Sequence, residues 1–129
     1  MEMSIAEIAD RFTILKLKVE RLPENDDIIY LFSLFNEELG YELSKLSSEI
    51  KASVEKKIQA LYNINAVTWS LEAEIRRGAI DEEKYLEEIG RRTILIRDNN
   101  KKRVAIKNDI CKLVGHISGL DIKIDHRSE

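Results

Sequence analysis

Apolar residues recur every three or four positions near the start of the chain, which is the spacing of one face of an α-helix. Ser4 and Glu7 form a capping box, in which each side chain can bind a free backbone N–H at the start of a helix. Pro23 cannot continue a helix and ends the pattern. We therefore predict a helix over residues 4–22. Its apolar seam consists of Ile5, Ile8, Phe12, Leu15, Val19 and Leu22.

Residues 28–35 are apolar at seven of eight positions. Asp26 and Asp27 precede them and can cap a new helix. A helix with one buried face shows polar residues between its apolar ones. This segment therefore predicts a helix that is covered from several sides, by its own chain or by another subunit. A buried strand is the alternative interpretation, but no neighbouring segment has the pattern of its partner strand.

A longer apolar stripe follows Gly40, where we expect the chain to kink or break. The stripe predicts a helix over residues 41–77, about 55 Å long. Arg76 and Arg77 suit the negative end of a helix, and Gly78 is a natural stop. The stripe consists of Leu43, Ile50, Val54, Leu61, Ile64, Thr68, Leu71 and Ile75.

A last long helix is predicted over residues 81–115, starting at Asp81 and ended by Gly115 and Gly119. Its seam consists of Tyr85, Ile89, Ile96, Ile106, Ile110, Leu113 and Ile117. Residues 120–125 alternate between apolar and polar, which is a strand pattern. Such a strand has no partner in its own chain, so it pairs across a dimer, lies on the bundle or stays loose.

Together these patterns predict an all-α fold. We expect an antiparallel bundle of three to four helices, two of them long and coiled-coil-like, with a short C-terminal strand as an optional addition. The chain has 129 residues, which suits one core rather than two. Residues 1–119 would form the bundle and residues 120–129 a tail. Five Gly and one Pro are too few for the turns of an all-β sandwich or barrel.

Composition adds a few exclusions. Charged residues are 35% and hydrophobic ones 43% of the chain, so it can build a core and is not a disordered tail. No stretch approaches ~18–20 consecutive apolar residues, so we expect no membrane segment. Glu2 lies where a secretory signal would carry Lys or Arg. The single cysteine, Cys111, has apolar neighbours and suits a core thiol, and we expect a cytoplasmic protein.

Charge is unevenly distributed along the second half of the chain. Residues 91–112 hold eight bases and two acids, whereas residues 72–90 hold seven acids and three bases. No aromatic residues interleave with the basic stretch, as a binder of single strands would require. The net charge of -3 also argues against a nucleic acid as partner. We interpret the basic stretch as a solvated, ion-paired face.

Polar residues interrupt the seam of the last helix at Arg92, Asn99 and Arg103. If the two long helices fold back on each other at residues 78–79, facing residue numbers add up to about 158. Arg103 would then lie near Glu55, and Arg92 near Asn65. Buried cations must be paired and hydrogen-bonded, so this layer should be a connected network. It either fixes the register of the helices or forms a pocket for an anionic ligand such as a phosphate or carboxylate.

Sets of residues for catalysis or metal binding are incomplete. His116 and His126 are the only histidines, and no Glu-x-x-His pair occurs. Glu7 and Asp10 place two acids on one face of the first helix, and carboxylates also cluster at Glu37, Glu38 and Glu42. All-α nucleoside-triphosphate pyrophosphohydrolases hold Mg²⁺ with such helix carboxylates, but here the spacing and the order of the two groups differ from their pattern. No glycine-rich phosphate loop occurs. We therefore predict no catalytic residues, no metal and no cofactor.

Three segments stand out in order along the chain: residues 4–15, the W-x-x-E-x-x-I-R segment at 69–76 and the N-x-x-R-x-x-I-K segment at 100–107. Together they resemble a group of small, uncharacterised helical proteins of bacteria and their phages. The group has no established activity, so the resemblance implies a helical bundle and no reaction. If the group has a site, the matching polar positions are Asp10, Glu72, Arg76, Asn100, Arg103 and Lys107. We interpret Trp69 as an anchor in the core or an interface.

Two functional hypotheses remain at this point. The first is a non-catalytic oligomeric interaction or assembly protein, a dimer formed through residues 28–35 and the long helices. The second is a protein that binds, or acts on, an anionic small molecule such as a nucleotide or sugar phosphate. Candidate ligand-binding residues for the second hypothesis are Asp10, Glu72, Arg76, Arg92, Asn100, Arg103 and Lys107.

Overall fold

The protein is an all-α bundle, as predicted. The computed structural model describes residues 3–77 and 82–118, and for residues 74–77, 82–86 and 116–118 the backbone alone. The helices are α1 (Ile5–Arg21), α2 (Asp26–Ser44), α3 (Ser48–Arg77) and α4 (Glu82–Ser118). The predicted strand at 120–125 lies outside the described residues. None of the described helices is long and apolar enough to cross a lipid bilayer.

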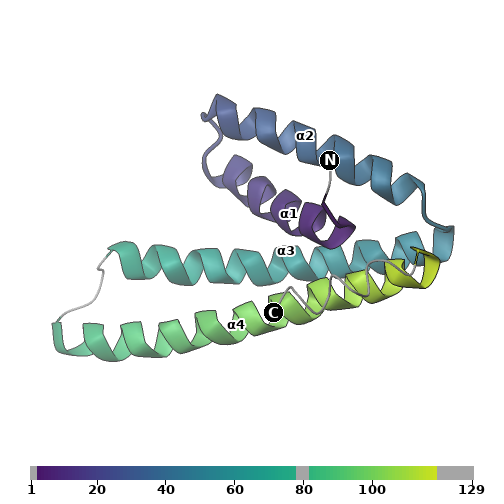
Figure 1. Ribbon diagram of the computed structural model, residues 1–129. Coiled ribbons are helices and arrows are strands. Elements are labelled where there is room, and N and C mark those ends of the chain that lie inside the picture. The colour runs from purple at the N-terminus through teal and green to yellow at the C-terminus, as the bar shows by residue number, and fades with distance from the viewer. Residues whose placement is uncertain (1–2, 78–81, 119–129) are drawn as a thin grey trace.

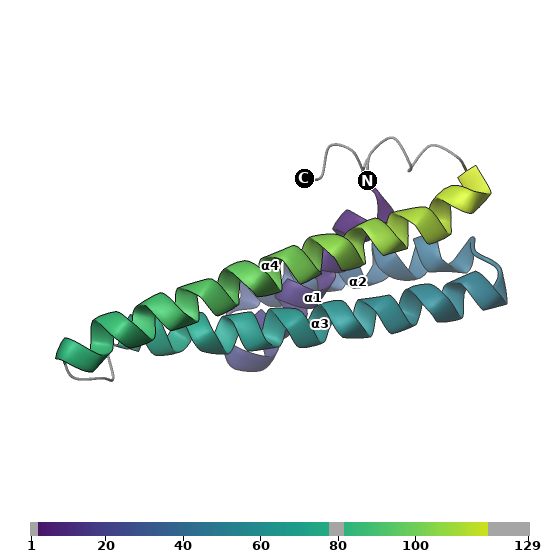
Figure 2. The ribbon, with the colours of Figure 1, turned by 90° about the horizontal axis from the view of Figure 1, so that it is seen from below.

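The helices form two antiparallel hairpins, α1 with α2 and α3 with α4 (Figures 1 and 2). Helix α1 contacts the other three helices, so it is the centre of the molecule. Helix α2 packs mainly on α1 and is the outermost helix on one side, whereas α4 lies on the opposite side (Figure 1). The α3–α4 hairpin extends beyond α1 and α2 at the end where α3 stops. This arrangement leaves α2 and half of the long hairpin covered on one side only.

Helix α1 is buried on two faces. The predicted seam faces α2, where the rings of Phe12 and Phe32 stack with centroids 5.4 Å apart. A second stripe of small residues, including Ala6, Ala9 and Thr13, is also buried and faces α3 and α4. Small side chains let helix backbones approach closely, which is how one helix can pack against three others. The apolar seam of the sequence predicts the first face, whereas the second face was not predicted.

The core joins all four helices. Its completely buried side chains include Ile8 of α1, Val54 and Leu61 of α3, and Ile110 of α4, and Leu39 of α2 packs against them. Each such residue contributes roughly 1.5–3 kcal/mol by leaving water. Cys111 lies in the same cluster and is buried, as expected for a packing thiol.

Two helix ends differ from the prediction. Gly40 lies inside α2, and the chain turns at residues 45–47, so the predicted start at residue 41 is wrong. The true signal is Ser47, whose Oγ accepts a hydrogen bond from the N–H of Ile50. Helix α4 likewise continues through Gly115 to Ser118. A single glycine costs a helix only about 1 kcal/mol, which packing of the buried Gly115 can offset.

Candidate functional site

The carboxylate of Asp10 lies at the centre of a polar layer between α1, α3 and α4. Asp10 is only 3% exposed. Arg103 of α4 donates from Nε to Oδ1 at 2.9 Å and from Nη2 to Oδ2 at 2.6 Å. The planar guanidinium matches a carboxylate in this two-point geometry, which adds direction to the charge attraction. Asp10 and Arg103 therefore tie α1 to α4 at one register.

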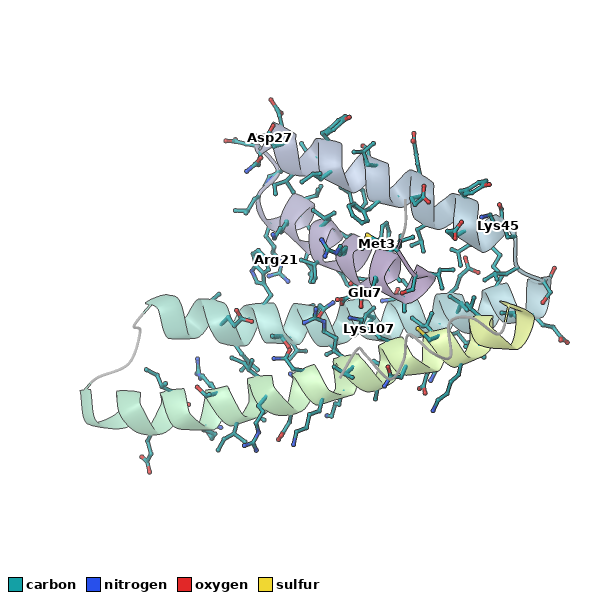
Figure 3. All side chains as sticks on the ribbon, in the orientation of Figure 1. Met3, Glu7, Arg21, Asp27, Lys45 and Lys107 are labelled. Carbon is teal, nitrogen blue, oxygen red and sulfur yellow. The ribbon has the colours of Figure 1, made fainter. Side chains whose placement is uncertain are left out.

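Lys107 adds a second ion pair one helical turn further along α4. Its Nζ lies 2.6 Å from Oε1 of Glu7 and 3.7 Å from Oδ2 of Asp10. Figure 3 shows Glu7 and Lys107 close together between the two helices. Glu7 and Asp10 are three residues apart, so they share a side of α1. Two carboxylates thus meet two cations, and their charges cancel.

Helix α3 joins this layer through Asn65. The Asn65 Nδ2 donates to Thr13 Oγ1 at 2.9 Å and to Asp10 Oδ1 at 3.4 Å. The hydroxyl of Thr13 donates in turn to the backbone carbonyl of Asp10 at 2.7 Å. We call Glu7, Asp10, Thr13, Asn65, Arg103 and Lys107 the Asp10 layer. A buried polar group that lacks partners is costly, and this layer supplies partners to the buried carboxylate from both α3 and α4.

The same contacts set the charge state of the arginine. Hydrogen bonds to Asp10 raise the pKa of Arg103 above its ordinary value, and partial burial opposes this effect. The negative charges of Asp10, Glu7 and Glu72 also raise it. Arg103 is therefore a permanent cation. Two of its N–H groups already bind Asp10, so Arg103 has fewer donors left for an incoming anion.

The partners of Arg103 and Arg92 differ from the sequence prediction. Arg103 binds Asp10 rather than Glu55, and Arg92 lies 3.4 Å from Glu88 on its own helix while Asn65 binds α1. Lys57 of α3 donates to Asp109 of α4 at 3.1 Å, and these numbers add up to 166 rather than about 158. The prediction assumed that the two helices meet at residues 78–79. Instead α4 begins beyond the end of α3 (Figures 1 and 2), which shifts the register.

The structure brings together most of the candidate ligand-binding residues, in two groups. Asp10, Arg103 and Lys107 belong to the Asp10 layer. Glu72 and Asn100 line an adjacent cleft of about 380 Å³ together with Arg103. Arg92 pairs with Glu88 and is not among the residues that line this cleft. The side chain of Arg76 lies outside the described part of the structure.

Sequence reasoning missed several members of this region. Thr13 was not assigned to the layer, Asn65 was placed in it opposite Arg92 rather than against α1, and Glu7 was considered only as an acid beside Asp10. A signal was available, because Ala6, Ala9 and Thr13 follow helical spacing beside Asp10 and mark a second buried face. A carboxylate within such a face requires a cation from another helix.

Chemically, the Asp10 layer is a closed set of neutralising contacts. This arrangement favours the interpretation that it fixes the register of three helices, rather than the interpretation that it holds an anion. Among the residues that the structure describes, no three His, Cys, Asp or Glu side chains are grouped so that they could hold a metal ion. No protein-family model, curated protein or solved structure matches the chain. The resemblance to uncharacterised helical proteins therefore rests on the three sequence segments.

Proposed function

We propose that this chain is a non-catalytic assembly protein whose copies associate through the outer face of α2. The observation that carries the proposal is a row of large apolar side chains exposed on that helix. They are Tyr30 at 65%, Tyr41 at 60%, Leu31 at 42%, Leu34 at 39% and Ile29 at 38% exposure. Tyr30, Leu34 and Tyr41 share one face of α2 by helical spacing, and exposed apolar patches are typical of interaction sites. The pattern of residues 28–35 requires cover from several sides, and because their own chain leaves them partly exposed, another copy of the chain is the cover that we propose.

Charge disfavours a second α2 as the partner surface. Helix α2 carries five acids and no base: Asp26, Asp27, Glu37, Glu38 and Glu42. Two such helices side by side would bring like charges together, which opposes association.

The outer face of α4 is a better match. Ile94 and Leu95 are 50% and 42% exposed on this helix. Lys101 and Lys102, which are also exposed, lie one to two turns further on the same face, because the helix repeats every 3.6 residues. An acidic apolar face of one copy therefore fits a basic apolar face of another.

The placement of the two faces determines the kind of assembly. Helices α2 and α4 lie on opposite sides of the molecule (Figure 1), so one copy can bind a partner on each side. Contacts between unlike surfaces build rings or open filaments rather than a closed pair. The dimer expected from the sequence would thus be the smallest of a range of oligomers, which grow as further copies bind.

Light scattering over a range of protein concentrations tests this proposal. We expect species larger than a dimer to form as concentration rises, and to dissociate as salt is added, because salt screens exposed charges. A protein that stays monomeric at every concentration and salt level would contradict the proposal.

Two variants separate the two faces. Tyr30→Ser with Leu34→Ser removes apolar contact from α2, and Ile94→Ser with Leu95→Ser removes it from α4. Each should be monomeric alone, because each lost apolar contact weakens association by about tenfold or more. When the two variants are mixed, they should form one-to-one pairs and no larger species. The first variant keeps only its α4 face and the second keeps only its α2 face, so each pair has a single contact. Val67→Ser is the matched control, because Val67 is 52% exposed but lies on α3.

A further inference from the structure

The cleft beside the Asp10 layer is lined by residues from two of the three segments that carry the resemblance. Trp69 and Glu72 come from the W-x-x-E segment of α3, and Asn100 and Arg103 come from the N-x-x-R segment of α4. These segments are about 30 residues apart in the chain, yet they line one cleft of about 380 Å³. That volume lies at the small end of the range for ligand pockets, roughly 300–1,000 Å³.

Three uncharged polar side chains in this cleft have unused hydrogen-bonding capacity. The buried hydroxyl of Thr68 has no hydrogen-bond partner. Among the described residues, no hydrogen bond is formed by the side chains of Trp69 or Asn100 either. An indole offers one donor and a flat apolar face, an amide offers donors and an acceptor, and a hydroxyl offers both. A buried hydroxyl without a partner is uncommon in folded proteins and calls for an explanation.

The charged groups at the cleft do not favour an anion. The guanidinium of Arg103 makes two hydrogen bonds to Asp10, whose negative charge opposes its positive charge. Glu72 adds a negative charge at the cleft, close enough to raise the pKa of Arg103. The groups that remain to recognise a ligand are the neutral donors and acceptors and the indole face.

We propose that this cleft binds a neutral ring compound that carries several hydroxyl groups, of about the size of a single sugar or a nucleoside. One face of the ring packs against Trp69, and its hydroxyl groups bond to Asn100 and, once the Thr68 side chain rotates toward the cleft, to the Thr68 hydroxyl. Ile14 and Leu17 of α1 provide the apolar wall. The site is separate from the outer faces of α2 and α4, so the binding proposal can be tested independently of the proposed assembly.

Tryptophan fluorescence gives a direct test, because Trp69 is the only tryptophan of the chain. The full-length protein is titrated with a panel of common pyranoses and ribonucleosides up to ~10 mM, about ten times a dissociation constant of 1 mM. We expect a saturable change in fluorescence with at least one compound. Comparing the sugars with the nucleosides shows which of the two classes binds. Glucose 6-phosphate and uridine monophosphate are the charged counterparts. They should bind no more tightly than the uncharged forms.

Two variants place the binding at this cleft. Asn100→Ala and Thr68→Val should each weaken it about tenfold, because each leaves a ligand group without its partner. In the absence of ligand, Thr68→Val should leave the melting temperature unchanged or raise it, since the hydroxyl that it removes is unpaired. Asn63→Ala, an exposed position of α3 that does not line the cleft, is the matched control and should bind normally.

Three results would overturn the proposal. The first is the absence of a saturable change with every neutral compound. The second is tighter binding of the phosphorylated forms, which would show that the cleft prefers an anionic ligand. The third is binding that survives both cleft variants unchanged, which would place the ligand elsewhere.

Discussion

At the scale of single residues, Asp10 explains why Arg103 interrupts an apolar seam. The carboxylate side chain is 4% exposed and that of Arg103 is 32% exposed, so the pair is buried on one side and reaches water on the other. Removing one partner of a buried pair leaves the other charge uncompensated, which typically costs 3–5 kcal/mol. Because Arg103 keeps partial access to water and Lys107 remains beside Asp10, the lower end of that range applies.

We expect Arg103→Ala to lower the free energy of unfolding by about 3 kcal/mol in urea denaturation. The double variant Asp10→Leu with Arg103→Leu should lose less, because it leaves no buried charge from this pair. Lys57→Ala is the control, since the Lys57–Asp109 pair has side chains 41% and 45% exposed and should contribute at most about 1 kcal/mol. A fully stable Arg103→Ala protein would show that the Asp10 layer does not hold the bundle together.

The sequence identified Arg103 as a member of a polar layer but assigned it the wrong partner, Glu55 rather than Asp10. The hydrophobic pattern of a helix shows which side is buried and does not show which helix covers it. The prediction paired Arg103 with Glu55 by assuming where the long hairpin closes. Asp10 is 93 positions away in the chain, and its contact depends on α1 inserting between α2 and the long hairpin. That insertion is a tertiary feature, and the small residues beside Asp10 were its only local sign.

At the scale of elements, the helices were predictable and their ends were less so. Repeating apolar positions fix the type of a long helix, because many positions contribute to the pattern. An end depends on one or two residues, and here Gly40 competed with Ser47 as the break. The structure shows that Ser47 caps α3 while Gly40 continues α2. The chain breaks at Ser47 because its hydroxyl binds a free N–H at the start of α3, whereas Gly40 only permits a turn.

Gly40 leads to a prediction about α2. Nothing lies within 4 Å of the position that a Cβ would occupy there. Gly40→Ala should therefore raise the free energy of unfolding by about 1 kcal/mol, because alanine favours the helix and meets no obstacle. Thermal and urea denaturation of dilute protein would measure this. A loss of stability would contradict the prediction and would indicate that another chain approaches the helix closely at this point.

At the scale of the whole molecule, the fold should be unevenly stable. Helix α1 and the ends of α3 and α4 that it covers form the core, in which Leu61 and Ile110 are fully buried. No side chain between residues 87 and 105 of α4 is buried, and the first part of α4 extends past α1 (Figure 1). Segments with few buried apolar contacts open more readily than the core.

Hydrogen exchange can test both this stability gradient and the proposed assembly. In dilute protein, backbone amides of residues 87–102 should exchange at least about tenfold faster than those of residues 106–114, because the latter open only with the core. At high protein concentration, exchange should slow in α2 and around Ile94 together, since assembly covers both faces at once. Slowing in α2 alone would indicate a symmetric pair of α2 helices and would contradict the proposed contact with α4. Equal exchange along all of α4 would contradict the gradient, because it would mean that the outer hairpin is held as firmly as the core.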